Sequence, residues 1–254
     1  GGQAGGIPCW YSIHNVVLQK ILREHGLKVV EKNPQAGEVK LSVMAPSDMV
    51  AALANRAIAG FIVAEPFNAV AEAKGVGKVL RFSGDVWRDH ACCVTLMQEH
   101  DIARRPEWVQ NVVSALVEGQ AWAAGHRADT ALMLSKQGPH KYTPHEDKVL
   151  QNVLAPAPEA WARYTESGII RHPEWHQRRI DFQPYPYPSY TEKLVEMLKE
   201  THIAGVNRFL DELSPQHVAQ DLVDARFVKQ AVEAGQFQQL FGLNGWTREE
   251  MIAV

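Results

Sequence analysis

The stretch IPCWYSIHNVVLQKILREHGL, residues 7–27, decides the fold. It starts as a short apolar segment, passes through two aromatic residues, a hydroxyl and an imidazole, and then continues as a helix. Apolar residues recur at helical spacing from Val16 to Leu22. Ser12 is a candidate N-cap of this helix and Gly26 a candidate C-cap. A strand that turns directly into a helix is the repeating unit of an α/β protein.

The following residues repeat this alternation of strand and helix. Strands are predicted at residues 39–45, 59–67 and 78–82, and helices at residues 49–57 and 68–75. This β-α-β-α-β order predicts an α/β fold with a parallel or mixed sheet and helices on both of its faces.

The pattern changes after residue 87. WRDHACCVTLM, residues 87–97, is interpreted as a polar crossover that enters a buried strand. The rest is mostly helical, including a long helix that Pro106 begins, and the proline-rich residues 184–190 predict an extended segment. The helices after residue 90 outnumber the strands that they could cover. We therefore expect part of the sheet to come from chain that precedes residue 1.

Composition and charge exclude two classes of partner. The 254 residues carry a formal net charge of −3 without a basic block, which argues against nucleic acid. No apolar run reaches the roughly 18 residues that a membrane span needs. The three cysteines, Cys9, Cys92 and Cys93, are interpreted as buried thiols, because an odd number with two adjacent members does not suit a disulfide framework.

Polar and aromatic side chains gather at three predicted strand-to-helix turns, residues 8–15, 45–48 and 65–68. Such turns meet at the carboxyl ends of parallel strands, where open α/β sheets bind ligands. The candidate ligand-binding residues are Trp10, Tyr11, Ser12, His14, Asn15, Ser47, Glu65 and Asn68.

Each type of side chain suggests a role at these turns. Helix N–H groups beside a hydroxyl suit a small oxyanion, and His14 could donate to the same ligand. Glu65 could accept from a ligand N–H or pair with a cation. Trp10 and Tyr11 could stack on a flat ligand. The alternatives are that Ser12 is an ordinary cap, as Ser47 would be, and that Trp10 belongs to the core.

No catalytic residue and no metal site is predicted. His172 and His176 stand four residues apart, a spacing that metal ligands use, but a third ligand is not evident and Pro173 suggests a helix start. Both histidines are therefore interpreted as surface residues.

Three stretches resemble one protein family. Residues 7–27 resemble the opening of the second lobe in the nitrate/sulfonate/bicarbonate-type solute-binding proteins of ABC importers. Residues 46–80, which contain Glu65-Pro66, look like the run that follows in this family, and residues 87–97 look like its return to the first lobe. The resemblance implies a type II periplasmic-binding-protein-like fold, with two lobes around a ligand cleft and a helix-rich C-terminal part.

The resemblance also implies an organisation. Residues 1–88 would be lobe two, an α/β ligand-binding half. Residues 89–254 would be the C-terminal part of lobe one with a helical extension, and the N-terminal part of lobe one would be missing from the chain.

The implied function is that of the solute-binding component of an ABC importer. It would capture a small anionic or polar organic ligand, such as nitrate, a sulfonate or taurine, without a cofactor. Its partners would be the permease and ATPase subunits, and it would reach the membrane only through the permease or a lost lipid anchor. The expected location is the periplasm or the outer face of the bacterial membrane.

Two alternatives remain open. The thiamine-pyrimidine-synthase-like enzymes share this superfamily and use PLP, and residues 90–93, His-Ala-Cys-Cys, faintly resemble their cysteine-rich stretch. The longer cysteine cluster of those enzymes is missing. An effector-sensing domain of a regulator is the other alternative, for which a fused DNA-binding helical pair would be expected, and none is visible.

Overall fold

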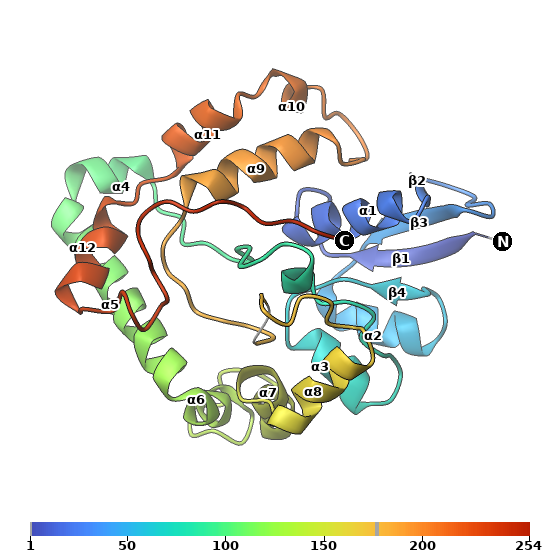
Figure 1. Ribbon diagram of the computed structural model, residues 1–254, viewed down its shortest axis with the longest axis horizontal. Coiled ribbons are helices and arrows are strands. Elements are labelled where there is room, and N and C mark those ends of the chain that lie inside the picture. The colour runs from blue at the N-terminus through green and yellow to red at the C-terminus, as the bar shows by residue number, and fades with distance from the viewer. Residues whose placement is uncertain (1, 176–177) are drawn as a thin grey trace.

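The computed structural model describes residues 2–175 and 178–254. Four strands form one sheet in the order β2-β3-β1-β4, and every neighbouring pair is parallel (Figure 1). The strands are β1 (Gln3–Ile7), β2 (Lys28–Val30), β3 (Glu38–Val43) and β4 (Gly60–Phe61). The helices of this α/β unit are α1 (Ile13–Glu24), α2 (Pro46–Ala54) and α3 (Phe67–Ala73). The predicted α/β class with a parallel sheet is confirmed.

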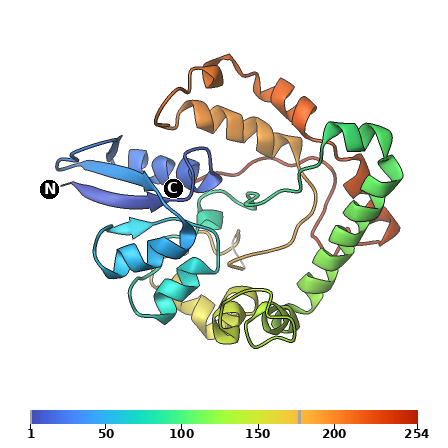
Figure 2. The same ribbon diagram turned by 180° about the vertical axis from the view of Figure 1, so that it is seen from behind.

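The remaining chain is helical and forms an arc that starts and ends beside the sheet (Figures 1 and 2). A short 3-10 helix, η1 (Ser83–Asp85), leads out of the α/β unit. The helices of the arc are α4 (Glu99–Arg104), α5 (Pro106–Gly125), α6 (Arg127–Leu134), α7 (Asp147–Leu154), α8 (Pro158–Glu166), α9 (Pro188–Lys199), α10 (Phe209–Glu212), α11 (Pro215–Leu222) and α12 (Arg226–Ala234). Extended segments without regular structure cross the space that the arc surrounds.

The sequence of β1 suits the centre of a sheet. Its last three residues are buried, and two of them are glycines. A Cβ atom added at Gly6 would lie 3.1 Å from the sulfur of Met44 and 3.3 Å from Cβ of Phe61. The absence of a side chain at Gly6 therefore allows its neighbours to approach the backbone closely.

One core cluster joins the beginning and the end of the chain. Val16 and Val17 of α1 pack with Met197 of α9 and with the buried Trp87. The C-terminal segment closes the same cluster, because Trp87 forms an isolated antiparallel bridge with Ile252. The chain end thus lies beside α1 (Figure 1). The division at residue 88 stays a prediction, and this cluster contains residues from both sides of it.

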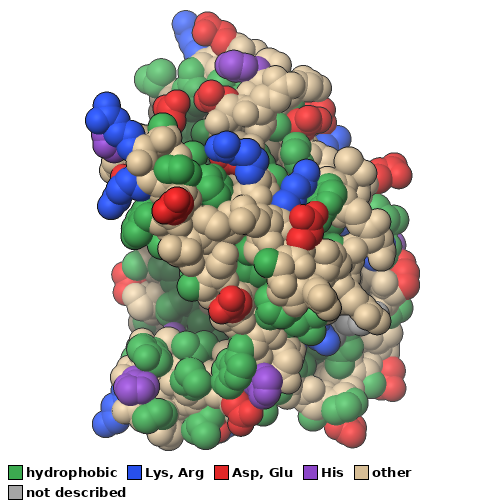
Figure 3. All heavy atoms as spheres, turned by 90° about the vertical axis from the view of Figure 1, so that its left-hand side faces the viewer, with side chains coloured by type: hydrophobic (Ala, Val, Ile, Leu, Met, Phe, Trp, Pro, Cys, Tyr) green, Lys and Arg blue, Asp and Glu red, His purple; other side chains and the backbone are tan. Residues whose placement is uncertain are grey.

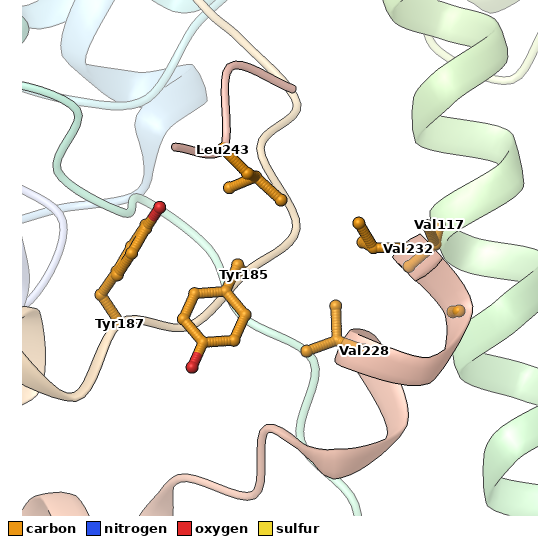
Figure 4. Packing of buried hydrophobic residues seen from close by; sticks show 7 residues of the cluster. Val117, Tyr185, Tyr187, Val228, Val232 and Leu243 are labelled. Carbon is orange, nitrogen blue, oxygen red and sulfur yellow. The ribbon is translucent and has the colours of Figure 1, made fainter. Parts of the chain in front are cut away.

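A second cluster holds the far side of the arc together. Val117 of α5 packs with Val228 and Val232 of α12. The ring of Tyr185 lies between Tyr187 and Val228, and both rings come from the extended segment before α9 (Figure 4). The predicted extended segment is therefore present at residues 184–187, but residues 188–190 form the first turn of α9 instead.

The surface of α5 carries aromatic side chains. Trp108 and Trp122 are 45% and 41% exposed. Figure 3 views the side of the molecule where α4, α5 and α12 lie, and hydrophobic side chains are spread over this face between charged ones. None of the helices among the described residues is long and apolar enough to cross a membrane.

Several sequence expectations were wrong. The strand predicted at residues 59–67 is only two residues long, and residues 78–82 and 91–97 form no strand. Leu80, Val94 and Leu96 are 87%, 64% and 86% exposed. An apolar alternating segment becomes a strand only beside a partner that accepts its backbone hydrogen bonds, and in the described part of the chain no strand lies next to these segments.

The cysteines and one helix cap also differ from expectation. Cys9, Cys92 and Cys93 are all free but exposed rather than buried. The predicted strand that would have buried Cys92 and Cys93 does not form. Helix α2 begins at Pro46, so its N-cap is Ala45 and not Ser47. Proline fits the first turn of a helix because it has no N–H to satisfy, and this starts the helix one residue before the serine.

Candidate functional site

A cavity of about 1980 Å³ lies between the α/β unit and the extended segments. The first turn of α1 reaches it through His14, and the turn after β4 reaches it through Glu65 and Asn68. A separate group of side chains comes from η1 and the segment after it. Ser83 belongs to η1, and His90, Cys92 and Cys93 follow it.

His14 stands at the start of α1 and faces the thiol of Cys92. Its Nε2 atom lies 3.8 Å from Cys92 Sγ. Burial, with a smaller contribution from the nearby His90, lowers the pKa of His14 to about 4. The imidazole is therefore neutral at neutral pH, with one nitrogen that donates and one that accepts. Burial also raises the pKa of Cys92, to about 12, so both groups meet the cavity uncharged.

His90 holds the segment that carries the two cysteines. Its Nε2 atom lies 2.8 Å from Ser83 Oγ and its Nδ1 atom 3.2 Å from the carbonyl oxygen of Ala91. The hydroxyl of Tyr190 donates to the same carbonyl at 2.8 Å. Burial lowers the pKa of His90. The ring thus acts as a neutral hydrogen-bonding group that fixes the backbone just before Cys92.

Glu65 belongs to a buried ion-pair network. Arg179 Nε donates to Glu65 Oε1 at 2.9 Å, and Arg179 Nη1 donates to Glu72 Oε2 at 2.7 Å. The Arg179 side chain has no exposed surface. Glu65 also accepts from the backbone N–H of Ala69 at 3.1 Å, and the hydroxyl of Tyr164 donates to Glu72 at 2.7 Å.

Burial has the largest effect on the pKa of Glu65 in this network. It raises the pKa of Glu65, and the Arg179 guanidinium offsets only part of the rise. Burial alone would lower the pKa of Arg179, but Glu65 and Glu72 outweigh it and raise that pKa. Glu65 was expected either to accept from a ligand N–H or to pair with a cation. In the structure it pairs with a cation, and that cation is Arg179 of the same chain.

Three of the expected residues fix local backbone. Asn68 Nδ2 donates to the carbonyl of Val63 at 2.7 Å across the turn after β4. Ser12 is the N-cap of α1, because its hydroxyl accepts from the Asn15 N–H at 3.2 Å. Asn15 is fully buried, and its side chain donates to the carbonyl of Trp10 at 2.7 Å.

Three others lie outside the wall of the cavity. Trp10 packs against a core cluster formed by Ile7, Leu22, Val39 and Leu41. Its ring meets the ring of His202 edge-on, with the two centroids 5.8 Å apart. Tyr11 is 41% exposed. Ser47 is exposed as well, and its hydroxyl donates to Asp48 at 3.4 Å. Of the eight expected residues, the structure brings His14, Glu65 and Asn68 to the cavity.

Sequence reasoning missed the residues that later segments bring to this wall. Cys92 is 78 residues from His14, and it was interpreted as buried. Its position beside His90 was the available signal. Arg179 is 114 residues from Glu65. A buried glutamate requires a counter-charge, but nothing in the sequence selects one among 26 lysines and arginines.

The described residues hold no group of three or more His, Cys, Asp or Glu side chains arranged to bind a metal ion. His172 Nδ1 lies 3.3 Å from Glu174 Oε1, and its ring stacks on Trp175 with centroids 4.2 Å apart. His176, the other member of the candidate histidine pair, lies outside the described residues.

Comparison with known proteins identifies the family. Residues 4–135, just over half of the chain, match the model of the NMT1-like family. The chain belongs to the NMT1-like family. The matched residues of this NMT1-like protein include the sheet except Gln3, together with His14, Glu65 and the two adjacent cysteines.

Curated relatives match parts of this NMT1-like protein. The nitrate/nitrite binding protein NrtA of Nostoc sp. is 31% identical over 85 residues, which are 34% of this chain and 19% of that protein. The bicarbonate transport ATP-binding protein CmpC of Synechocystis sp. is 31% identical over 113 residues, which are 44% of this chain and 16% of that protein. The matched region thus spans less than a fifth of either relative.

Two solved structures share the fold. The periplasmic nitrate-binding protein NrtA from Synechocystis matches 98% of this chain with a TM-score of 0.67 and 14% identity. The ligand-binding component of an ABC-type import system from Staphylococcus aureus matches 91% with a TM-score of 0.61 and 21% identity. The match covers 62% and 64% of those chains. The expected periplasmic-binding-protein-like fold is confirmed.

Proposed function

We propose that this chain is the solute-binding component of an ABC importer and that it captures a small anionic or polar organic ligand in the cavity. The observation that carries the proposal is the position of the cavity. It opens beside the first turn of α1 and the turn after β4, where a parallel α/β sheet usually binds its ligand. The likeness to two ligand-binding proteins over nine-tenths or more of this chain supports it.

His14 is the side chain that we propose contacts the ligand. It lies at the N-terminal end of a twelve-residue helix, where backbone N–H groups favour an acceptor. Its neutral imidazole adds one donor or one acceptor without adding charge. Glu65 and Asn68 shape the neighbouring turn, and the ion pair with Arg179 occupies the carboxylate of Glu65.

Partners and location follow from the same proposal. A solute-binding component delivers its ligand to a permease whose transport an ATPase drives. We propose that this chain acts in the periplasm or at the outer face of the membrane, and the structural likeness to the nitrate-binding protein of Synechocystis, which is periplasmic, supports the first of these locations. The sulfonate or taurine class stays a prediction beside nitrate and bicarbonate.

The alternative is a PLP-dependent, thiamine-pyrimidine-synthase-like enzyme. The observation that favours it is the exposed Cys92-Cys93 pair, which lines the cavity beside His14. A bound PLP would add an absorbance band of its own, and an enzyme would form product. A binding component would be stabilised by its ligand without turnover.

A thermal-shift screen tests the proposal. Nitrate, bicarbonate, taurine, alkylsulfonates, aminopyrimidines and PLP are added separately, and a ligand present at 100 times its Kd should stabilise the fold by about 2.7 kcal/mol. His14→Gln should abolish the shift. His100→Gln is the matched control, because His100 is an exposed histidine on α4.

The outcomes separate the alternatives. A shift lost in His14→Gln but kept in His100→Gln supports ligand binding at the cavity. A shift that survives in His14→Gln contradicts the proposed site. A PLP shift accompanied by product formation favours the enzyme, and the absence of any shift in both the wild type and a longer form of the protein contradicts the binding function.

A further inference from the structure

Two thiols meet at the wall of the cavity. Cys92 and Cys93 are adjacent in the chain, and Cys93 Sγ donates to Cys92 Sγ at 3.8 Å. Both side chains are exposed and both line the cavity. Cys92 Sγ also lies 3.8 Å from His14 Nε2. A chemical change at this pair would therefore reach the histidine of the candidate site.

We propose that Cys92 and Cys93 form a modification site, at which a small disulfide oxidant converts the two thiols to a vicinal disulfide and ends the contact between Cys92 and His14. This inference goes beyond the proposed function. It does not depend on which ligand the cavity holds, because it needs only the two sulfurs and their access to solvent.

The reaction is a double thiol–disulfide exchange. Cys93 loses its proton to solvent, and its thiolate attacks one sulfur of oxidised glutathione, which expels one glutathione thiolate. Cys92 then loses its proton, and its thiolate attacks the Cys93 sulfur of the mixed disulfide, which expels the second glutathione thiolate. Two protein thiols become one disulfide, and one oxidised glutathione becomes two thiols, which take up the two protons.

Cys92 is the second thiol to react, and its thiol stays protonated until the mixed disulfide on Cys93 has formed. Burial and the neighbouring Cys93 raise its pKa, so little thiolate is present at neutral pH. The closing step should therefore accelerate as the pH rises. His90 and Tyr190 hold the Ala91 carbonyl from two sides, which keeps the two sulfurs at the cavity wall while the ring closes.

Closure should be reversible. Consecutive Cα atoms are about 3.8 Å apart, which is less than the roughly 4.4–6.8 Å of ordinary disulfides, so a disulfide between neighbours is strained. Strained and exposed disulfides have more oxidising potentials and are easily reduced. The cavity wall would thus alternate between two forms, one with a thiol against His14 and one without it.

The experiment measures the wild-type chain, so no variant has to fold for the first result. The folded protein is incubated with excess oxidised glutathione, quenched with acid, denatured, alkylated and weighed by intact-mass and peptide mass spectrometry. The expected result is that the peptide containing Cys92 and Cys93 loses two hydrogens and takes up no alkylating agent. No glutathione should remain on that peptide, and dithiothreitol should restore three thiols in the whole chain.

Variants and a spectroscopic signal sharpen the test. Cys9→Ser is the matched control, since it removes the other exposed thiol and should close as the wild type does. Cys92→Ser should keep one glutathione on Cys93, because the resolving thiol is gone. The His14 ring signals in an NMR spectrum, assigned with His14→Gln, should shift when the disulfide forms.

Three results would overturn the proposal. One is that all three thiols stay alkylatable after oxidation. Another is that glutathione stays on the peptide that contains Cys92 and Cys93 without ring closure, and the third is an intramolecular disulfide between Cys9 and one of these two cysteines. His14 signals that do not move on closure would remove the link between the disulfide and the candidate site.

Discussion

The guanidinium of Arg179 forms ion pairs with two carboxylates. It contacts Glu65 and Glu72 from a position without exposed surface. Arg179→Met should lower the free energy of unfolding by about 3–5 kcal/mol, because it leaves a buried carboxylate without its partner. Urea denaturation followed by circular dichroism measures this change.

The preceding residue is the matched control. Arg178 pairs with Asp181 at 3.2 Å, and both side chains are about half exposed. Arg178→Met should change the free energy of unfolding by less than about 1 kcal/mol. Equal losses in the two variants would mean that the network of Arg179 is no more important than a surface ion pair.

The histidines of the cavity make stability depend on pH. The folded pKa of His14 is about 4 and that of His90 is also lowered, whereas an unfolded histidine titrates near 6.5. Between these values the unfolded chain binds more protons, so the free energy of unfolding falls as the pH drops. From pH 7.5 to 5.5 the loss due to His14 should be about 1.3 kcal/mol, and His90 acts in the same direction.

Urea denaturation at these two pH values checks the expectation. Glu65 has a raised pKa, which acts in the opposite direction at lower pH, and comparing variants with the wild type cancels its effect. His14→Gln should reduce the pH dependence. His100→Gln should leave the pH dependence unchanged. A pH dependence that is reduced in His100→Gln but not in His14→Gln would contradict the role of His14.

Helix starts provide the test at the scale of elements. Ser12 caps α1 with its side chain, whereas Ser47 is exposed one residue inside α2. Ser12→Ala should cost about 1 kcal/mol of unfolding free energy, and Ser47→Ala less than about 0.5 kcal/mol. Thermal and urea denaturation of both variants measure the difference, and a larger cost at Ser47 would contradict the assigned caps.

The elements also show how far sequence reasoning reaches. The sheet unit, α1 and the long helix that Pro106 begins were predictable, because apolar periodicity and capping residues are local signals. The strands predicted at residues 78–82 and within residues 87–97 do not form, and the sequence could not show this, because a strand depends on a partner elsewhere in the chain. His14 was found at a helix start, but Arg179 required knowledge of contacts between distant segments.

Trp87 links the sheet unit to the chain end at the scale of the whole molecule. Its indole N–H donates to Glu250 at 2.7 Å, and the Ala253 N–H donates to the Val86 carbonyl at 2.9 Å. Trp87→Phe keeps a ring in the core but leaves Glu250 without this donor. The loss should be about 1–3 kcal/mol, and the amides of both segments should exchange faster together.

Hydrogen exchange read by mass spectrometry distinguishes this from local loosening. Trp108→Phe is the control, because Trp108 is 45% exposed on α5 and should change little. If only the amides near Trp87 exchanged faster and the C-terminal segment were unaffected, the two segments would not open as one cooperative unit, which would contradict the prediction.

The large sequence separation between Glu65 and Arg179 has a consequence during synthesis of the chain. Glu65 leaves the ribosome 114 residues before its partner. At about 5–20 residues per second, the sheet unit spends about 6–23 s with this carboxylate unmatched. Trp87 waits longer, since Glu250 follows it by 163 residues. The sheet unit therefore lacks both of these partners until the later segments of the chain have been made.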